Sequence, residues 1–111
     1  MDSATAAEFR ELHARICKAI ADPKRLMLIN EMRDGPRAVG DLCEAIGISQ
    51  SNASQHLAVL RDRGVVSAQR TGTNVYYSLR SPKIVQAVDL LREFLAEDLA
   101  DRGVLGNAAT G

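Results

Sequence analysis

The most reactive side chains of this 111-residue chain are two thiols and two imidazoles. They are Cys17, Cys43, His13 and His56. Two thiols can form a disulfide when their Cα atoms come within about 7 Å, and they can also form a polysulfide link or a thiolate site. Both cysteines fall on apolar stripes of expected helices, where a free cysteine commonly packs as a small hydrophobic side chain. A packing role and an effector role for Cys17 and Cys43 therefore both stay open.

No set of residues nominates a catalytic site. The sequence has no Gly-x-Ser-x-Gly motif, no phosphate-cradling glycine loop and no paired metal-ligand motif. We expect His56 to be packed or to face a phosphate, because neither His13 nor another ligand type repeats near it. The chain is therefore not expected to be an enzyme or to hold a resident cofactor.

The charges are unevenly distributed although their sum is zero, with fourteen Lys and Arg against fourteen Asp and Glu. Residues 49–83 carry five basic side chains against Asp62 alone, which gives +4, whereas residues 1–48 carry seven basic and eight acidic side chains. Residues 84–111 carry two and five. The positive middle segment indicates where phosphates would lie in a nucleic-acid complex; a merely solvated surface is the alternative.

Composition and hydropathy place the chain among ordinary globular proteins. Hydrophobic residues make up 46% and charged residues 25% of the chain, which fits one domain over residues 1–111. The longest aliphatic run, 26–29, is far shorter than the roughly 20 residues that cross a bilayer. The first residues lack the basic start and apolar run of a secretory signal. We therefore expect a cytoplasmic protein that does not enter a membrane.

Capping residues divide the first third of the chain into two helices. The first helix is expected over 5–21, beginning at Thr5, whose hydroxyl would form a capping box with Glu8. The pair Asp22–Pro23 stops this helix and begins the next one, because Asp caps well and Pro suits the first helical position. The second helix is expected to end at Gly35–Pro36.

The middle of the chain predicts two more helices followed by a hairpin. The helices occupy 39–63 and are separated by Gly47 and the capping residue Ser49, which is the spacing of a helix-turn-helix. After them the pattern becomes extended, and 65–79 predicts two strands around a four-residue turn, 71–74. The fold class is therefore mainly α with one β-hairpin.

The last helix, 82–101, has an apolar stripe too wide for one small domain to cover. This excess indicates a dimer. The residues expected at the dimer interface are Phe9, Leu12, Ile16, Val88, Leu91, Phe94 and Leu95. The expected order is four helices, two strands and a final helix.

Several separated motifs together resemble the ArsR/SmtB family of bacterial winged-helix repressors. Residues 22–29 resemble the family's D-x-x-R-L-x-I-L pattern, and 39–57 are similar to its helix-turn-helix. Residues 60–61, 64–66 and 76–79 are similar to its helix end and hairpin wing. The resemblance implies a winged helix-turn-helix homodimer whose interface is formed by the first helix, 5–21, and the last helix, 82–101. It also implies that this dimer binds an inverted-repeat operator in double-stranded DNA. It also implies release by a metal ion, an arsenical or a redox signal.

A helix that enters the major groove presents the outward side chains of its N-terminal end to the bases first. Gln and Asn can pair two-pronged with adenine, and Ser suits phosphates or either base type. Arg61 and Arg63 are further candidates for backbone contacts, and the hairpin tip would lie beside the minor groove or phosphates. The residues expected at DNA are Ser49, Gln50, Ser51, Asn52, Ser54, Gln55, His56, Arg61, Arg70, Thr71, Thr73 and Asn74. A dimer that binds only proteins, or RNA, is the alternative function.

The metal sites of known relatives are incomplete in this chain. The positions that match the zinc- and cobalt-binding last helix are Ser81, Lys83, Phe94 and Glu97. Of the thiol run that binds arsenic or cadmium in other relatives, Cys43 alone matches, with Ala38 and Gly40 at the earlier places. A metal, metalloid or redox effector acting through Cys17 and Cys43 is the hypothesis that remains.

Overall fold

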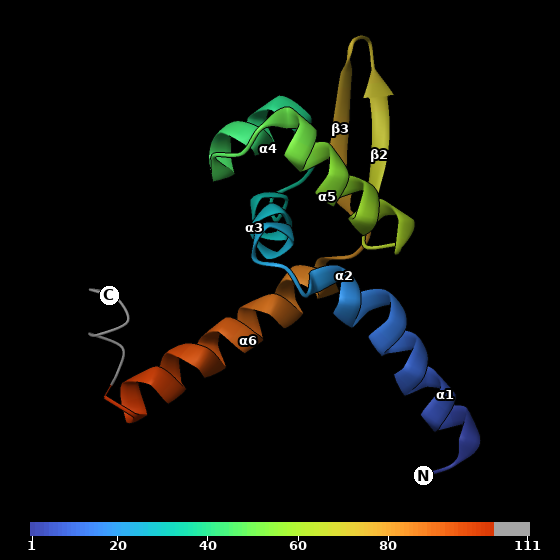
Figure 1. The fold of residues 1–111 in the computed structure, drawn as a ribbon, viewed down its shortest axis with the longest axis vertical. Helices are drawn as coiled ribbons and strands as arrows, with labels where there is room; N and C mark the ends of the chain where they lie inside the picture. Colours follow the sequence, from blue (N-terminus) through green and yellow to red (C-terminus); the bar gives the residue numbers. More distant parts are fainter. Residues whose placement is uncertain (104–111) are drawn as a thin grey trace.

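The structure is a computed structural model and describes residues 1–103; residues 104–111, which the expected domain includes, lie outside the described part. In chain order the elements are α1 (Ser3–Glu11), η1 (Leu12–Cys17), α2 (Lys18–Ile20), α3 (Pro23–Glu31), β1 (Arg37–Ala38), α4 (Val39–Ile46), α5 (Gln50–Asp62), β2 (Val66–Thr71), β3 (Asn74–Leu79) and α6 (Pro82–Asp101). Figure 1 shows α3, α4, α5 and the β2–β3 hairpin together at one end, with α1 and α6 diverging from the other. The predicted fold class is confirmed.

The elements α1, η1 and α2 follow one another without a break and form one N-terminal helix, residues 3–20. Asp2 caps it: its Oδ1 accepts from the Thr5 N–H at 2.7 Å, and the Thr5 hydroxyl donates to its Oδ2 at 3.1 Å. These hydrogen bonds lower the pKa of the Asp2 carboxyl. The predicted capping box at Thr5 and Glu8 is therefore wrong, because Asp2 supplies a cap earlier in the chain. The η1 segment is π-helical, with wider turns than an α-helix.

The second predicted helix is shorter than the sequence pattern suggested. Asp22 caps α3 by accepting from the N–H of Lys24 at 2.8 Å, but the helix ends at Glu31 rather than at Gly35. The chain then turns and forms the two-residue strand β1, which no sequence pattern indicated. In β1, Arg37 pairs antiparallel with Tyr77 of β3, so the sheet has three strands in the order β1-β3-β2.

The helix-turn-helix forms over the predicted residues. The helix α4 ends at Gly47, whose φ of +71° is the left-handed conformation that glycine adopts without strain. Ser49 then caps α5, with its hydroxyl accepting from the Asn52 N–H at 3.1 Å. Two residues, Gly47 and Ile48, therefore suffice to separate α4 from the capping residue of α5.

The β2–β3 hairpin, called the wing below, is tighter than predicted. Thr71 pairs with Asn74 in the antiparallel register, so only Gly72 and Thr73 form the loop instead of four residues. Gly72 has a φ of +64°. Two-residue hairpins need a positive φ at the first loop position, which glycine supplies at little cost.

One hydrophobic core lies where α3, α4 and α5 meet the start of β2 and the first turns of α6. Its buried members are Ala19, Leu28, Ile29, Met32, Leu42, Ala53, Leu57, Leu60, Val65, Val66, Val85 and Val88. The inward stripe predicted for α5 is therefore confirmed. Val88 was expected at the dimer interface, but it is only 5% exposed and belongs to the core of its own chain. That part of the interface prediction is wrong.

The molecule is flat, with extents of 49 × 46 × 22 Å over the described residues. The N-terminal helix and the outer turns of α6 project from the core as two arms (Figure 1). None of the helices within residues 1–103 combines the length and hydropathy needed to span a bilayer.

Candidate nucleic-acid interface

The N-terminal half of α5 presents amide and hydroxyl groups to solvent. Gln50, Ser51, Ser54 and Gln55 are exposed, whereas Ala53 on the same stretch is fully buried. The helical period thus separates polar side chains from the core, and it leaves donors and acceptors at the end of the helix that would meet base edges first.

Two predicted contact residues at this end have structural roles. The Ser49 hydroxyl is engaged as the helix cap. Asn52 is half-buried, and its Oδ1 is a buried atom with no hydrogen-bond partner among residues 1–103. Leaving a buried carbonyl oxygen unpaired costs roughly 1–3 kcal/mol.

His56 is half-buried and turned toward α3. Its Nδ1 lies 3.2 Å from Nη1 of Arg25. Arginine has donors only, so Nδ1 is the acceptor in this contact. His56 was expected either to be packed or to face a phosphate, and the contact of its Nδ1 with Arg25 corresponds to the packed role.

The wing supplies a second polar surface. Arg70, Thr71, Thr73 and Asn74 are all exposed at its tip. Figure 1 shows the wing extending beside α5, at the end of the molecule away from the projecting parts of α1 and α6. A guanidinium and short hydroxyl and amide side chains on a narrow hairpin can contact phosphates or a groove edge.

The two arginines at the end of α5 differ in what they contact. Arg61 is exposed, as a phosphate contact requires. Arg63 instead donates from Nη1 to the carbonyl oxygen of Ala14 at 2.5 Å, while its own carbonyl accepts from Nε of Arg15 at 3.3 Å. Arg63 therefore ties α5 to the N-terminal helix, and the expectation that it contacts the DNA backbone is not supported.

The projecting arms carry large apolar side chains in solvent. Phe9 and Leu12 on the N-terminal helix are exposed, and so are the residues of a stripe on α6: Leu90, Leu91, Phe94 and Leu95. Sequence reasoning missed Leu90. An open groove of about 590 Å³ between α3, α4 and α6, with Met27 and Ile46 in its lining, continues the apolar surface. Exposed apolar areas of this kind mark interaction surfaces.

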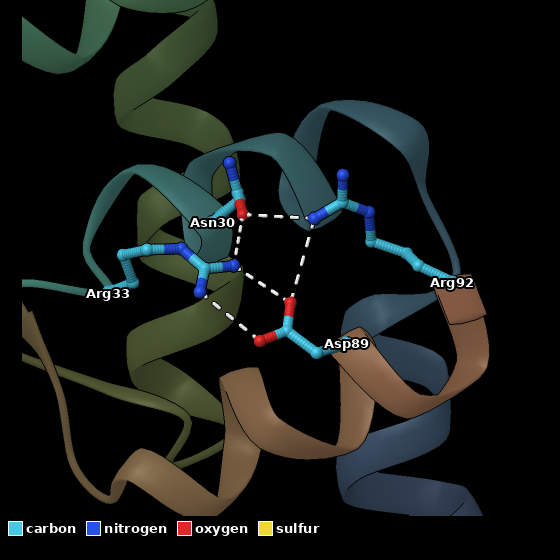
Figure 2. A network of polar contacts seen from close by, with 4 residues as sticks. All are labelled: Asn30, Arg33, Asp89 and Arg92. Atoms are coloured by element: carbon cyan, nitrogen blue, oxygen red, sulfur yellow. Dashed lines mark hydrogen bonds and ion pairs between the residues drawn. The ribbon is translucent and has the colours of Figure 1, made fainter.

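A polar network holds α6 against α3 (Figure 2). Arg33 donates to both carboxylate oxygens of Asp89, at 2.8 and 3.2 Å, and to Oδ1 of Asn30 at 2.6 Å. Arg92 lies 3.6 Å from Asp89 and 3.5 Å from the same Asn30 oxygen. The hydrogen bond from Arg33 lowers the pKa of the Asp89 carboxyl, and that bond in turn raises the pKa of Arg33. The network thus links Asp89 and Arg92 of α6 to Asn30 of α3 and to Arg33, which follows α3 in the chain.

The two cysteines are both free thiols, Cys17 exposed and Cys43 half-buried against the core. They lie on η1 and α4, which stand well apart in Figure 1. Among residues 1–103, no group of three or more His, Cys, Asp or Glu side chains is arranged to hold a metal ion. An effector role for the thiols stays a prediction.

Comparisons with known proteins agree with this geometry. Residues 22–68 match the family described as "Bacterial regulatory protein, arsR family". The HTH-type transcriptional regulator NmtR of Mycobacterium tuberculosis is 42% identical over 89 residues, 80% of this chain and 71% of that protein. A probable mercury resistance operon repressor of Streptomyces lividans is 40% identical over 87 residues, 78% of this chain and 70% of that protein.

A solved structure extends the likeness to three dimensions. The homodimeric winged helix-turn-helix DNA-binding domain of Mb0332 from Mycobacterium bovis superimposes with a TM-score of 0.76 at 30% identity, covering 89% of this chain and 91% of that one. That protein is described as a possible ArsR-family transcriptional regulator. The chain belongs to the ArsR family of bacterial regulatory proteins.

Proposed function

We propose that this chain is a homodimeric, sequence-specific DNA-binding repressor that releases its operator when it meets an effector. The observation that carries the proposal is the arrangement of two surfaces at opposite ends of the molecule. The exposed amides and hydroxyls of α5 lie beside the wing at one end, and the exposed apolar stripes of the N-terminal helix and α6 lie at the other. The first surface suits DNA, and the second suits another copy of the chain.

In this proposal α5 lies in the major groove and the wing contacts the flanking backbone or minor groove. A two-fold dimer would present two α5 helices about 34 Å apart to successive major grooves of an inverted repeat. The residues proposed to read bases are Gln50, Ser51, Ser54 and Gln55, and those proposed to meet the backbone are Arg61, Arg70, Thr71, Thr73 and Asn74. Ser49 and Asn52 shape the start of α5, and His56 supports it.

The apolar arms argue for the dimer. Proposed interface residues are Phe9, Leu12, Leu90, Leu91, Phe94 and Leu95, with Ile16 where the N-terminal helix joins the core. A soluble monomer rarely exposes so many large apolar side chains on two helices that project from its core. The relative Mb0332 is described as homodimeric, which supports the same assembly here.

The test begins with selection of duplexes from a random library by the purified protein. Affinity for the selected duplex is then measured by fluorescence anisotropy over a salt series. If the dimer contacts about eight phosphates, the logarithm of the affinity should decrease with the logarithm of salt concentration with a slope near −7. A flat salt response, or selection of no duplex, would favour the alternative of a protein-binding or RNA-binding module.

A matched pair of glutamine variants tests the role of α5. Gln55 is exposed on α5 and Gln86 is exposed on α6. A bidentate contact to adenine is worth roughly 1–3 kcal/mol, so Gln55→Ala should weaken specific binding by about 5- to 150-fold. Gln86→Ala should leave it unchanged. Equal effects of the two substitutions would contradict the placement of α5 in the groove.

For the effector we propose reaction at the thiols, because Cys17 is exposed and neither cysteine is in a disulfide. A probable mercury resistance operon repressor is among the relatives, which supports a soft-metal or thiol-reactive signal without identifying it. The test compares operator release by oxidants, arsenite, persulfides and metal ions in the wild type and in Cys17→Ser and Cys43→Ser. Unchanged release after both substitutions would end this part of the proposal.

A further inference from the structure

Arg25 connects the N-terminal helix to α5 through three polar contacts. From the first turn of α3, its Nε donates to the carbonyl of Ala19 at 2.5 Å and its Nη2 to the carbonyl of Lys18 at 3.4 Å. Its Nη1 donates to Nδ1 of His56 on α5 at 3.2 Å. The carbonyls at the end of a helix lack partners within it, so Arg25 satisfies the end of the N-terminal helix and binds α5 with the same planar group.

A second connection joins the same two helices further along. Nε of Arg15 donates to the carbonyl of Arg63, and Nη1 of Arg63 donates to the carbonyl of Ala14. The chain is close here: a Cβ built on Gly64 would lie 2.8 Å from Nη2 of Arg15, and Gly64 has a φ of +79°. The positive φ favours glycine at this position, whereas the guanidinium of Arg15 is the end of a flexible side chain and could shift to make room for a Cβ.

We propose that Arg15, Arg25, His56 and Arg63 form a polar bridge that sets the orientation of α5 relative to the N-terminal helix. The two connections meet α5 in its middle and at its end, so α5 cannot rotate or tilt without breaking one of them. The N-terminal helix carries Phe9 and Leu12, which the proposed function assigns to the dimer interface. Arg25 is thus a positioning residue for DNA binding.

The bridge has a specific consequence, which rests on the proposed function. If dimer contacts fix the N-terminal helix and the bridge fixes α5 on it, the distance between the two α5 helices is set by the dimer. A rigid dimer binds operators of one half-site spacing and discriminates against others. Without the bridge each α5 would adjust its position, so the preference for one spacing would weaken while the dimer and the fold persist.

The experiment measures affinity for duplexes whose two selected half-sites are separated by the selected spacing and by one or two additional base pairs. In the wild type, affinity should decrease steeply with the inserted pairs. In Arg25→Met and in Arg15→Ala, affinity for the best spacing should decrease about tenfold, within the typical range for coupled sites, and the penalty for inserted pairs should shrink by a similar factor. Arg10→Ala, on the exposed part of the same N-terminal helix, is the control.

A double-substitution cycle adds a test of the contact itself. Arg25→Met with His56→Leu should change the spacing preference no more than Arg25→Met alone, because Arg25→Met already removes the contact with His56 together with the contacts to the carbonyls of Ala19 and Lys18. Melting temperature and dimer dissociation are measured alongside. Arg15 is half exposed, so Arg15→Ala keeps the test valid even if substitution of the partly buried Arg25 prevents folding.

The outcomes separate the two proposals. A spacing preference that stays as steep in Arg15→Ala and Arg25→Met as in Arg10→Ala would overturn the bridge while leaving the repressor function intact. An equal loss of affinity at every spacing would also overturn it, because that pattern describes a direct phosphate contact. Failure of the wild type to bind any duplex would overturn the proposed function and the role of the bridge with it.

Discussion

Phe94 offers the sharpest test of the apolar arm on α6. It is 65% exposed in the isolated chain, and it sits between Leu91 and Leu95 on the same exposed face. Substitution by alanine removes a large apolar side chain from the proposed dimer interface and leaves the core untouched. Dimerisation should therefore weaken while the fold of each chain is preserved.

The expected size of the effect follows from the exposed area. An aromatic residue buries on the order of 200 Å², so 65% exposure leaves about 130 Å² for a partner to cover. At about 25 cal/mol per Å², full burial contributes about 3 kcal/mol per chain and about 6 kcal/mol per dimer. The alanine retains part of this area, and interfaces bury side chains incompletely. We therefore expect a loss of about 3 kcal/mol per dimer, about half of the value for full burial. Phe94→Ala should then raise the dimer dissociation constant at least about a hundredfold.

Sedimentation equilibrium measures the dissociation constant, and circular dichroism checks that the helical content is unchanged. Gln86→Ala is the matched control, since Gln86 is exposed on the same helix but is polar. The reasoning is refuted if Phe94→Ala dimerises as tightly as Gln86→Ala. It is also refuted if Phe94→Ala loses its helical content as a monomer, because an exposed side chain should not hold the core together.

Three further substitutions test the core, a cap and the polar network. Leu57 is fully buried, so Leu57→Ala should lower the free energy of unfolding by about 2–5 kcal/mol in urea titrations, and a cost below about 1 kcal/mol would contradict its core position. Ser49→Ala removes the cap of α5 and should cost about 1 kcal/mol by the same measurement, whereas no cost would contradict the cap. The lowered pKa of Asp89 means that its contribution is fully present above the ordinary carboxyl pKa and is lost as pH decreases through the lowered value. Asp89→Asn should therefore lower the melting temperature at neutral pH and converge with the wild type in acid; a constant difference at every pH would contradict the charge-based explanation.

The helix-turn-helix could be predicted from sequence because local residues determine it. Gly47 ends one helix, Ser49 begins the next, and the inward positions Ala53, Leu57 and Leu60 follow the helical period. Each of these effects acts within one or two turns of chain. The order and type of the elements were therefore accessible without any knowledge of the tertiary structure.

The strand β1 and the end of α3 were not accessible in the same way. Two residues, Arg37 and Ala38, are too few to show an alternating pattern. They pair with Tyr77 and Tyr76 of β3, which are 40 and 38 positions away along the chain. The sequence pattern placed the end of this helix at Gly35–Pro36, but α3 ends at Glu31. The structure of residues 37–38 therefore depends on pairing with a strand that is distant in sequence.

Exposure within the candidate site was predictable, but its contacts were not. The outward positions Gln50, Ser54 and Gln55 follow from the helical period. The partner of His56 is Arg25 on α3 and the partner of Arg63 is Ala14 on η1, at sequence separations of 31 and 49 residues. A charge count treats every arginine of a basic segment alike, so it could not separate the exposed Arg61 from Arg63, which is committed to a backbone carbonyl.

The π-helical stretch η1 begins at Leu12 and lies between Phe9 on α1 and the core residue Ala19 on α2. Each residue of an α-helix advances the side-chain direction by about 100°, so removal of one residue from η1 would swing the apolar arm by about that angle. Such a deletion would leave α4, α5 and the wing unaltered in sequence. A lineage could in this way acquire subunits that no longer pair with the ancestral protein, through a single-codon loss and without any change in the operator that each subunit reads.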